Sequence, residues 1–201
     1  MKGPSAKLFE IAESQQGYFT FQQAINAGFS DANHAYHVKS GDWIRAYRGI
    51  YRLAKYPVGE RGELVQWYLW SRNRSDVPQG IYSHYTALDV YELCDYMPPK
   101  LHMTVPLNFR RMANIPDILV LHRKKLQPEE IVEMQGYKTT TALRTLIDVI
   151  EEGKLQAELI DQAINEAAKK GLITKSKVSQ FEHVYASMPI EKIQKVMKET
   201  A

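Results

Sequence analysis

The sequence lacks features that several large protein classes require. It has one cysteine, Cys94, among 201 residues, so neither an internal disulfide nor a zinc site built from several cysteines can form. It contains no run of 18 or more apolar residues, so no membrane-spanning helix is predicted. Its first residues also lack the apolar stretch of a signal peptide. These absences favour a soluble protein of a reducing compartment, and we expect it in the cytoplasm.

An excess of positive charge is also missing. The formal net charge is only +3, which excludes histone-like polycations, and any nucleic-acid binding must therefore come from local basic patches. The positive excess lies in the first two thirds of the chain, whereas the last third is slightly acidic. Since 44% of the residues are hydrophobic, the chain can bury a core, either in one large domain or in a small domain followed by a medium one.

The first sixty residues predict three short helices followed by a hairpin. Capping residues and helix-ending glycines place the helices at about 5–16, 20–28 and 30–40. Residues 43–53 carry aromatic and β-branched side chains around a turn at Arg48 and Gly49, where glycine can take a positive φ. In the third helix, the spacing predicts that Ala32, Ala35, Tyr36 and Val38 face the other helices and that Asn33, His34, His37 and Lys39 face outward.

Three helices and a basic hairpin are the order of a winged helix-turn-helix, whose third helix enters the major groove while the hairpin, or wing, lies against the DNA backbone. Asparagine can bond adenine, histidine and tyrosine can reach base edges or phosphates, and arginine can neutralise phosphates. We therefore predict a DNA-binding domain at residues 1–57. The candidate DNA-binding residues are Asn33, His34, Tyr36, His37, Lys39, Arg45, Arg48 and Arg52.

Two other interpretations of this segment stay open. A small three-helix unit with a hairpin can be a protein-docking module, and arginines on an exposed hairpin often form a solvated edge that prevents strand pairing. His34 and His37 could also be metal ligands, but no third ligand stands at a fixed spacing nearby. The clustering of polar side chains on the third helix favours DNA.

Residues 58–201 predict a mixed α+β domain with a small sheet and C-terminal helices. Strand patterns occur at 101–105, 118–122 and 131–139. Helices are predicted at 60–73, 83–93, 141–152, 155–170, 174–187 and 190–199.

Arg144 and Asp148 stand four residues apart on one of these helices and are expected to pair across a turn. The apolar face of that helix consists of Leu143, Leu146, Ile147 and Ile150. A structural role is the first interpretation of Arg144. Because arginine clusters serve anion recognition, an alternative is contact with phosphates or with an acidic partner. The candidates for such a contact are Arg110, Arg111, Arg123 and Arg144.

Four segments resemble the AbiEi family of antitoxins. Residues 44–53 (IRAYRGIYRL) are similar to the family's wing, and residues 139–148 (TTTALRTLID) resemble its TTxxRTLxD signature. Residues 83–88 (SHYTAL) and 103–106 (MTVP) follow the family in the same order. The resemblance extends from about residue 5 to residue 170, and residues 171–201 match nothing in it. It implies a transcriptional autorepressor and antitoxin of a type IV toxin-antitoxin system in abortive infection, a form of phage defence. The implied partners are the double-stranded DNA of its own promoter and a nucleotidyltransferase-like toxin. From the sequence itself we expect no membrane partner and no cofactor.

An enzyme is the less favoured alternative. Asp117 with Glu152 and Lys154 superficially matches the PD…ExK pattern of metal-dependent nucleases, but Gly153 ends a predicted helix where that pattern requires a strand. Ser83 with His84, or Cys94 with His102, could act as nucleophile and base, but each pair lacks an orienting third group. We therefore predict no catalytic residues and no metal site. The second functional alternative is a stand-alone winged-helix regulator whose C-terminal domain dimerises or senses a ligand.

Overall fold

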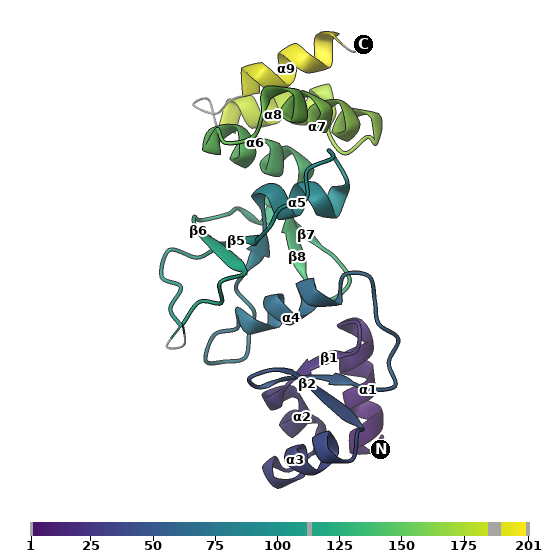
Figure 1. Cartoon of the computed structure of the whole chain (residues 1–201). Coiled ribbons are helices and arrows are strands. Elements are labelled where there is room, and N and C mark those ends of the chain that lie inside the picture. The colour runs from purple at the N-terminus through teal and green to yellow at the C-terminus, as the bar shows by residue number, and fades with distance from the viewer. Residues whose placement is uncertain (1, 112–113, 185–189, 200–201) are drawn as a thin grey trace. The chain divides into compact units, whose positions relative to one another are not determined.

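A computed structural model of the chain describes residues 2–111, 114–184 and 190–199 (Figure 1). The chain forms two compact units. The first comprises Met1–Gly80 and Glu133–Lys138, and the second comprises Ile81–Val132 and Thr139–Ala201. The predicted architecture, a winged helix-turn-helix followed by a mixed α+β part with a sheet and C-terminal helices, is confirmed.

The first unit contains three helices, a three-stranded sheet and a fourth helix. The antiparallel sheet has the strand order β1-β3-β2. Strand β1 was not predicted, because its three residues lie between the glycine after the first helix and the start of the second helix and look like a loop. The elements are α1 (Pro4–Ser14), β1 (Tyr18–Thr20), α2 (Phe21–Ala27), α3 (Asp31–Lys39), β2 (Trp43–Tyr47), β3 (Ile50–Leu53) and α4 (Gly62–Trp70).

Local sequence signals define the ends of these elements. The Thr20 side chain accepts a hydrogen bond from the Gln23 backbone, and the Gln23 side chain accepts one from the Thr20 backbone, so a capping box begins α2. Gly28 ends α2 in the left-handed conformation, as predicted. Gly49 has a φ of +70°, which confirms the predicted turn between β2 and β3. The core beneath the sheet contains Leu8, Ala12, Phe19, Ala24, Ala27, Trp43 and Tyr51.

The compact first unit is larger than the predicted 57-residue domain. Helix α4 packs against β1 and β3, and its residues Leu64, Val65 and Trp70 are buried. Burying this apolar face against the small sheet explains why α4 belongs with the winged helix. The division at residues 57 and 58 stays a prediction, since it concerns which parts fold and act separately.

The second unit combines a sheet with a stack of helices. The sheet order is β6-β5-β4-β8-β7; β5 pairs parallel with β6, and β4 pairs antiparallel with β5 and parallel with β8. The sheet strands and the helix that follows β4 are β4 (Ile81–Tyr82), α5 (His84–Tyr91), β5 (Leu101–Val105), β6 (Leu119–Arg123), β7 (Ile131–Glu133) and β8 (Lys138–Thr140). A 3₁₀ turn, η1 (Pro128–Glu130), precedes β7.

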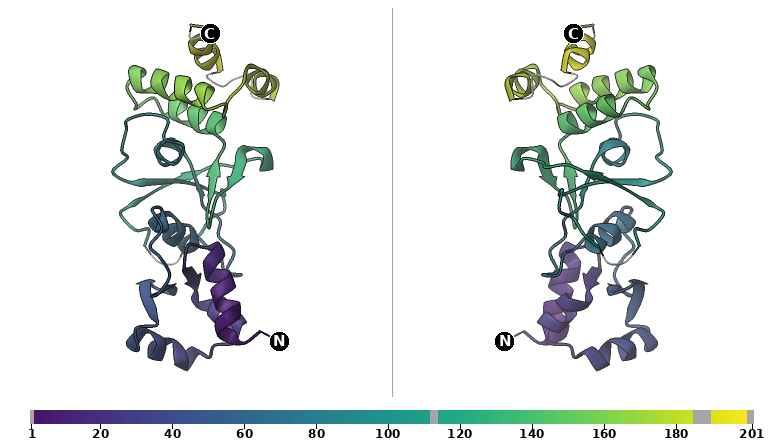
Figure 2. Two further views of the ribbon diagram at one scale, coloured as in Figure 1. Left: turned by 90° about the vertical axis from the view of Figure 1, so that its right-hand side faces the viewer. Right: turned by 90° about the vertical axis from the view of Figure 1, so that its left-hand side faces the viewer.

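The C-terminal helices pack on α5 and on one another. They are α6 (Ala142–Glu152), α7 (Ala157–Lys169), α8 (Lys175–Val184) and α9 (Ile190–Glu199), and Figure 2 shows them, green to yellow, gathered at one end of this unit. Their shared core includes Leu88, Leu146, Ile164 and Ile193. The predicted helices correspond to these elements, although the predicted residues 185–187 lie outside the described part. The predicted strand at 131–139 is two short strands, because Gly136 turns the chain at a φ of +88°.

Candidate nucleic-acid interface

The face of helix α3 that packs against the core is not the face that the sequence spacing predicted. His34 is only 4% exposed, and its ring contacts those of Phe21, Trp43 and Tyr51 at centroid distances of 4.4, 5.3 and 5.7 Å. Burial lowers the pKa of His34, an effect that the charge of Asp31 only partly opposes. The prediction that His34 faces outward is therefore wrong, because aromatic packing places this imidazole in the core as a neutral group.

The outer face of α3 consists of small and polar side chains. Asn33 and Lys39 are exposed, as predicted. Tyr36 is 65% exposed, whereas the spacing had placed it with the inward residues. Ala32 and Ala35 are exposed as well. Because residues three apart on a helix are neighbours, Asn33, Tyr36 and Lys39 form a continuous polar face that a DNA groove can accept.

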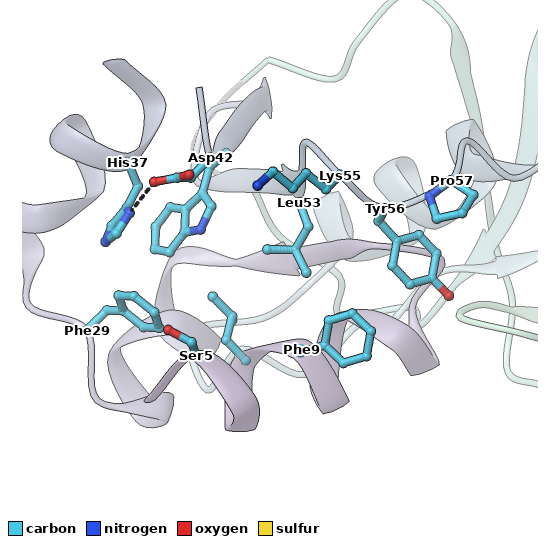
Figure 3. Close-up of a pocket in the computed structure, with 11 residues that line it drawn as sticks. Ser5, Phe9, Phe29, His37, Asp42, Leu53, Lys55, Tyr56 and Pro57 are labelled. Atoms are coloured by element: carbon cyan, nitrogen blue, oxygen red, sulfur yellow. Dashed lines mark hydrogen bonds and ion pairs between the residues drawn. The ribbon is translucent and has the colours of Figure 1, made fainter. Parts of the chain in front are cut away.

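His37 links α3 to the base of the hairpin. Its side chain is 22% exposed, and its Nδ1 lies 3.3 Å from Oδ2 of Asp42. The imidazole stacks on the Trp43 ring at a centroid distance of 4.6 Å. Figure 3 shows His37 and Asp42 side by side, joined by a dashed line. Hydrogen bonds from Ser40 and His37 lower the pKa of Asp42. His37 is therefore mainly a structural contact between α3 and β2, and it lies only partly on the predicted outward face.

The wing places two of its three arginines in solvent. Arg45 and Arg48 are exposed, and Arg48 stands in the turn beside Gly49. Arg52 is half-buried, and its Nη1 donates to the Tyr56 carbonyl at 2.8 Å. Arg45 and Arg48 are thus placed to reach phosphates, whereas Arg52 fastens the chain that leaves β3.

Sequence reasoning missed one side chain at the wing. Arg72, in the segment after α4, donates through Nη2 to the Gly49 carbonyl at 3.2 Å. The same carbonyl accepts the Phe21 N–H at 3.0 Å. No local pattern could have indicated this contact, because 23 residues separate the two partners.

An open, mostly apolar cavity of about 560 Å³ lies beside the His37–Asp42 pair (Figure 3). Its walls come from α1, from the residues around α3 and from the chain after β3. Phe9 is 47% exposed at its edge. The lining residues are Ser5, Leu8, Phe9, Phe29, His37, Asp42, Trp43, Leu53, Lys55, Tyr56 and Pro57.

In the second unit, the four candidate arginines do not form one surface. Arg144 is 1% exposed, and its guanidinium pairs with Asp148, as predicted, and also with Glu130. A surface contact through Arg144 is therefore excluded by burial. Arg110 and Arg123 are exposed and Arg111 is half-buried. Arg123 donates to the Phe109 carbonyl at 2.8 Å, which brings it close to the segment that carries Arg110.

Three histidines meet inside the second unit, a feature that no sequence spacing indicated. The rings of His84 and His122 stack at a centroid distance of 3.6 Å and an angle of 11°. His102 Nδ1 lies 3.0 Å from His122 Nε2, so one of these nitrogens donates to the other. Burial is the main cause that lowers the pKa of His84 and of His102 to about 4 and also lowers that of His122. The cluster is therefore neutral at pH 7.

A chain of two hydroxyl groups leads to the ring of His84. Thr104 Oγ1 donates to Ser83 Oγ at 2.8 Å, and Ser83 Oγ lies 2.9 Å from His84 Nδ1. A hydroxyl has one donor and two acceptor positions, so Ser83 can bond to Nδ1 of His84 while it accepts from Thr104. Ser83 is fully buried, so this pair is a packing element rather than an exposed nucleophile and base.

Glu152 of the nuclease-like pattern does not lie on a strand, as that pattern requires. Glu152 is the last residue of α6, and Asp117 is exposed in the turn before β6. Within residues 2–111, 114–184 and 190–199, no group of three or more His, Cys, Asp or Glu side chains has an arrangement that could hold a metal ion.

Comparison with known proteins finds a family match for part of the first unit. Residues 6–54 match the model of a family described as transcriptional regulator, AbiEi antitoxin, and this segment runs from α1 to the end of the wing. No curated protein matches the chain. Among the described helices, none is long and apolar enough to cross a membrane. Residues 6–54, which contain the three helices and the wing, are thus similar to the AbiEi antitoxin family of transcriptional regulators.

Proposed function

We propose that this protein is a DNA-binding autorepressor and antitoxin that occupies its own promoter and counteracts a nucleotidyltransferase-like toxin. The proposal is supported by two features that occur in the same segment of the chain. The segment that matches the antitoxin regulators, residues 6–54, is also the segment in which an exposed polar helix face adjoins two exposed wing arginines. The later segments that resemble the family lie outside this match, so the antitoxin activity rests on the family description.

The proposed binding mode assigns separate tasks to α3 and to the wing. Asn33 bonds a base edge in the major groove, with Tyr36 and Lys39 beside it on the same exposed face. Arg45 and Arg48 neutralise phosphates and set the position of the unit on the duplex. His34 has no direct part, because its ring is buried. His37 and Arg52 support α3 and the wing from within.

Substitutions on the wing and on α3 are expected to have different effects. Replacing Arg45 and Arg48 together with alanine should weaken binding to all duplexes alike, because phosphates carry no sequence information. Asn33→Ala should cost about 1–3 kcal/mol on the promoter and little on a random duplex. Arg74→Ala, which removes an exposed arginine outside both elements, is the control. Equal losses on both duplexes for Asn33→Ala would show that α3 does not read sequence.

Neutralisation of the toxin is tested in the cell. A neighbouring gene for a nucleotidyltransferase-like protein is expressed alone, with the wild-type chain, and with the Arg45→Ala, Arg48→Ala chain. We propose that the second unit carries the antitoxin activity, so the double variant should restore growth as well as the wild type while it fails to repress the promoter. A neighbouring protein that is not toxic would favour a stand-alone regulator instead.

A further inference from the structure

The segment between α4 and β4 is a tightly bonded loop. Ser71 Oγ accepts the backbone N–H groups of Gln79 and Gly80 at 3.1 and 2.8 Å. The Asn73 side chain accepts two further N–H groups within the loop. Asp76 has a φ of +62°, a conformation that costs energy for a residue with a side chain and that surrounding contacts must hold. The loop is therefore a built structure rather than a loose connection.

Arg72 extends from this loop to the wing turn. Its Nε lies 2.9 Å from Oδ1 of Asp76, its Nη1 donates to the Leu69 carbonyl at 2.9 Å, and its Nη2 donates to the Gly49 carbonyl. A β-carbon on Gly49 would lie 2.9 Å from Nη2 of Arg72, so the glycine permits this close approach. All three nitrogens of the guanidinium are thus used, each in a different direction.

The same ion pair reaches the start of α2. Oδ2 of Asp76 accepts the hydroxyl of Thr20, the residue that caps α2. The side chains of Arg72 and Asp76 are only 15% and 16% exposed. Burial lowers the pKa of Arg72, and the charge of Asp76 opposes this effect, so the guanidinium stays charged. One partly buried pair therefore connects the wing turn with the helix-turn-helix.

We propose that Arg72 is a positioning residue for DNA binding, which holds the wing turn so that Arg48 meets a phosphate without further ordering. The proposal rests on the proposed function and assigns a role to a residue outside the matched segment 6–54. A hairpin turn that is already fixed loses less conformational entropy when it binds, and this favours affinity. A lysine cannot replace Arg72, because an ammonium cannot make three bonds in these fixed directions.

The test uses the full chain and a double-mutant cycle. Arg72→Lys keeps the charge but loses the guanidinium geometry, and Arg74→Lys makes the same change at an exposed position of the same loop. Dissociation constants for promoter and random duplexes are measured for the wild type and both variants, each with and without Arg48→Ala. Near-UV circular dichroism and the thermal transition report the fold.

We expect Arg72→Lys to weaken binding to both duplexes by about tenfold, and Arg74→Lys to leave it unchanged. Arg48→Ala should cost about tenfold in the wild type but less than about twofold in Arg72→Lys, because the wing is already misplaced. If Arg72→Lys unfolds, Asp76→Asn takes its place, since it removes the negative charge of the pair. The cost of Arg48→Ala should then be reduced in the Asp76→Asn background in the same way. Wild-type affinity in Arg72→Lys, or losses of Arg72→Lys and Arg48→Ala that simply add, would overturn the positioning role of Arg72 but not the proposed function. A wild-type chain that binds neither duplex would overturn the proposed function as well.

Discussion

Replacing Arg144 with methionine is expected to lower the free energy of unfolding of the second unit by about 3–5 kcal/mol. Glu130 and Asp148 are 1% and 2% exposed, and the guanidinium lies 3.3 Å from Oε1 of Glu130 and 3.2 Å from Oδ2 of Asp148. Burial lowers the pKa of Arg144, but Asp148, Glu130 and Glu151 raise it overall. Removing this cation leaves two carboxylates buried with much of their charge uncompensated.

Urea unfolding followed by far-UV circular dichroism measures this loss. All three tryptophans, Trp43, Trp67 and Trp70, belong to the first unit, so their fluorescence serves as an internal reference. Arg110→Met removes an exposed arginine and is the control, with an expected change below about 0.5 kcal/mol. Adding Glu130→Gln and Asp148→Asn to Arg144→Met should recover most of the stability. A single Arg144→Met variant as stable as the control would contradict the structural role.

Acid is expected to destabilise the second unit through its histidine cluster. His84 and His102 have pKa values of about 4 in the folded state, below the ordinary value of about 6.5. Between these values the unfolded chain binds more protons than the folded one, so stability falls as the pH falls. The contribution is complete above about pH 6.5 and lost near pH 4, and it amounts to about 3 kcal/mol for each histidine.

The surrounding charges also enter this pH dependence. The charges of Asp148 and Glu152 on α6 favour protonation of His84. The charge of Lys154 opposes protonation of His102. Lys154 and Lys124 together oppose protonation of His122. Burial raises the pKa of Glu152, but effects that include the hydrogen bond from Lys154 outweigh burial and lower this pKa overall. The net result is a cluster that stays neutral until well below pH 6.5.

Urea unfolding at about pH 7.5 and about pH 4.5 compares the wild type with a His84→Gln, His102→Gln variant. The wild type should lose several kcal/mol more than the variant over this interval. His37→Gln, in the first unit, should retain the wild-type loss. Equal pH dependence in the wild type and the double variant would show that other groups cause the acid sensitivity.

The sequence predicted the elements whose signals are local. The N-cap at Thr20, the positive φ at Gly49 and the pairing of Arg144 with Asp148 depend on residues within a few positions of one another, and each is present. The prediction of which α3 residues face the core was wrong, because histidine counts as polar in any spacing pattern. Only the rings of Phe21, Trp43 and Tyr51 reveal that His34 belongs in the core.

Long-range contacts account for what the sequence did not reveal. The cluster of His84, His102 and His122 joins three separate elements, and a stacked contact between rings 38 positions apart leaves no periodic trace. The contact of Arg72 with Gly49 depends on the placement of α4, whose packing on the winged helix was not predicted either. Sequence reasoning predicted a DNA interface on α3 and the wing, while tertiary packing decided which side chains these elements expose.

The salt dependence of binding by the full chain to its promoter duplex and to a scrambled duplex tests the central claim most directly. We predict that the logarithm of the association constant falls with the logarithm of salt concentration at a slope of about −4 to −5 for both duplexes, the value expected for about five phosphate contacts by the whole domain. The promoter should be bound more tightly at every salt concentration, because α3 reads bases. Affinity that does not change with salt, or equal affinity for both duplexes throughout, would contradict the account.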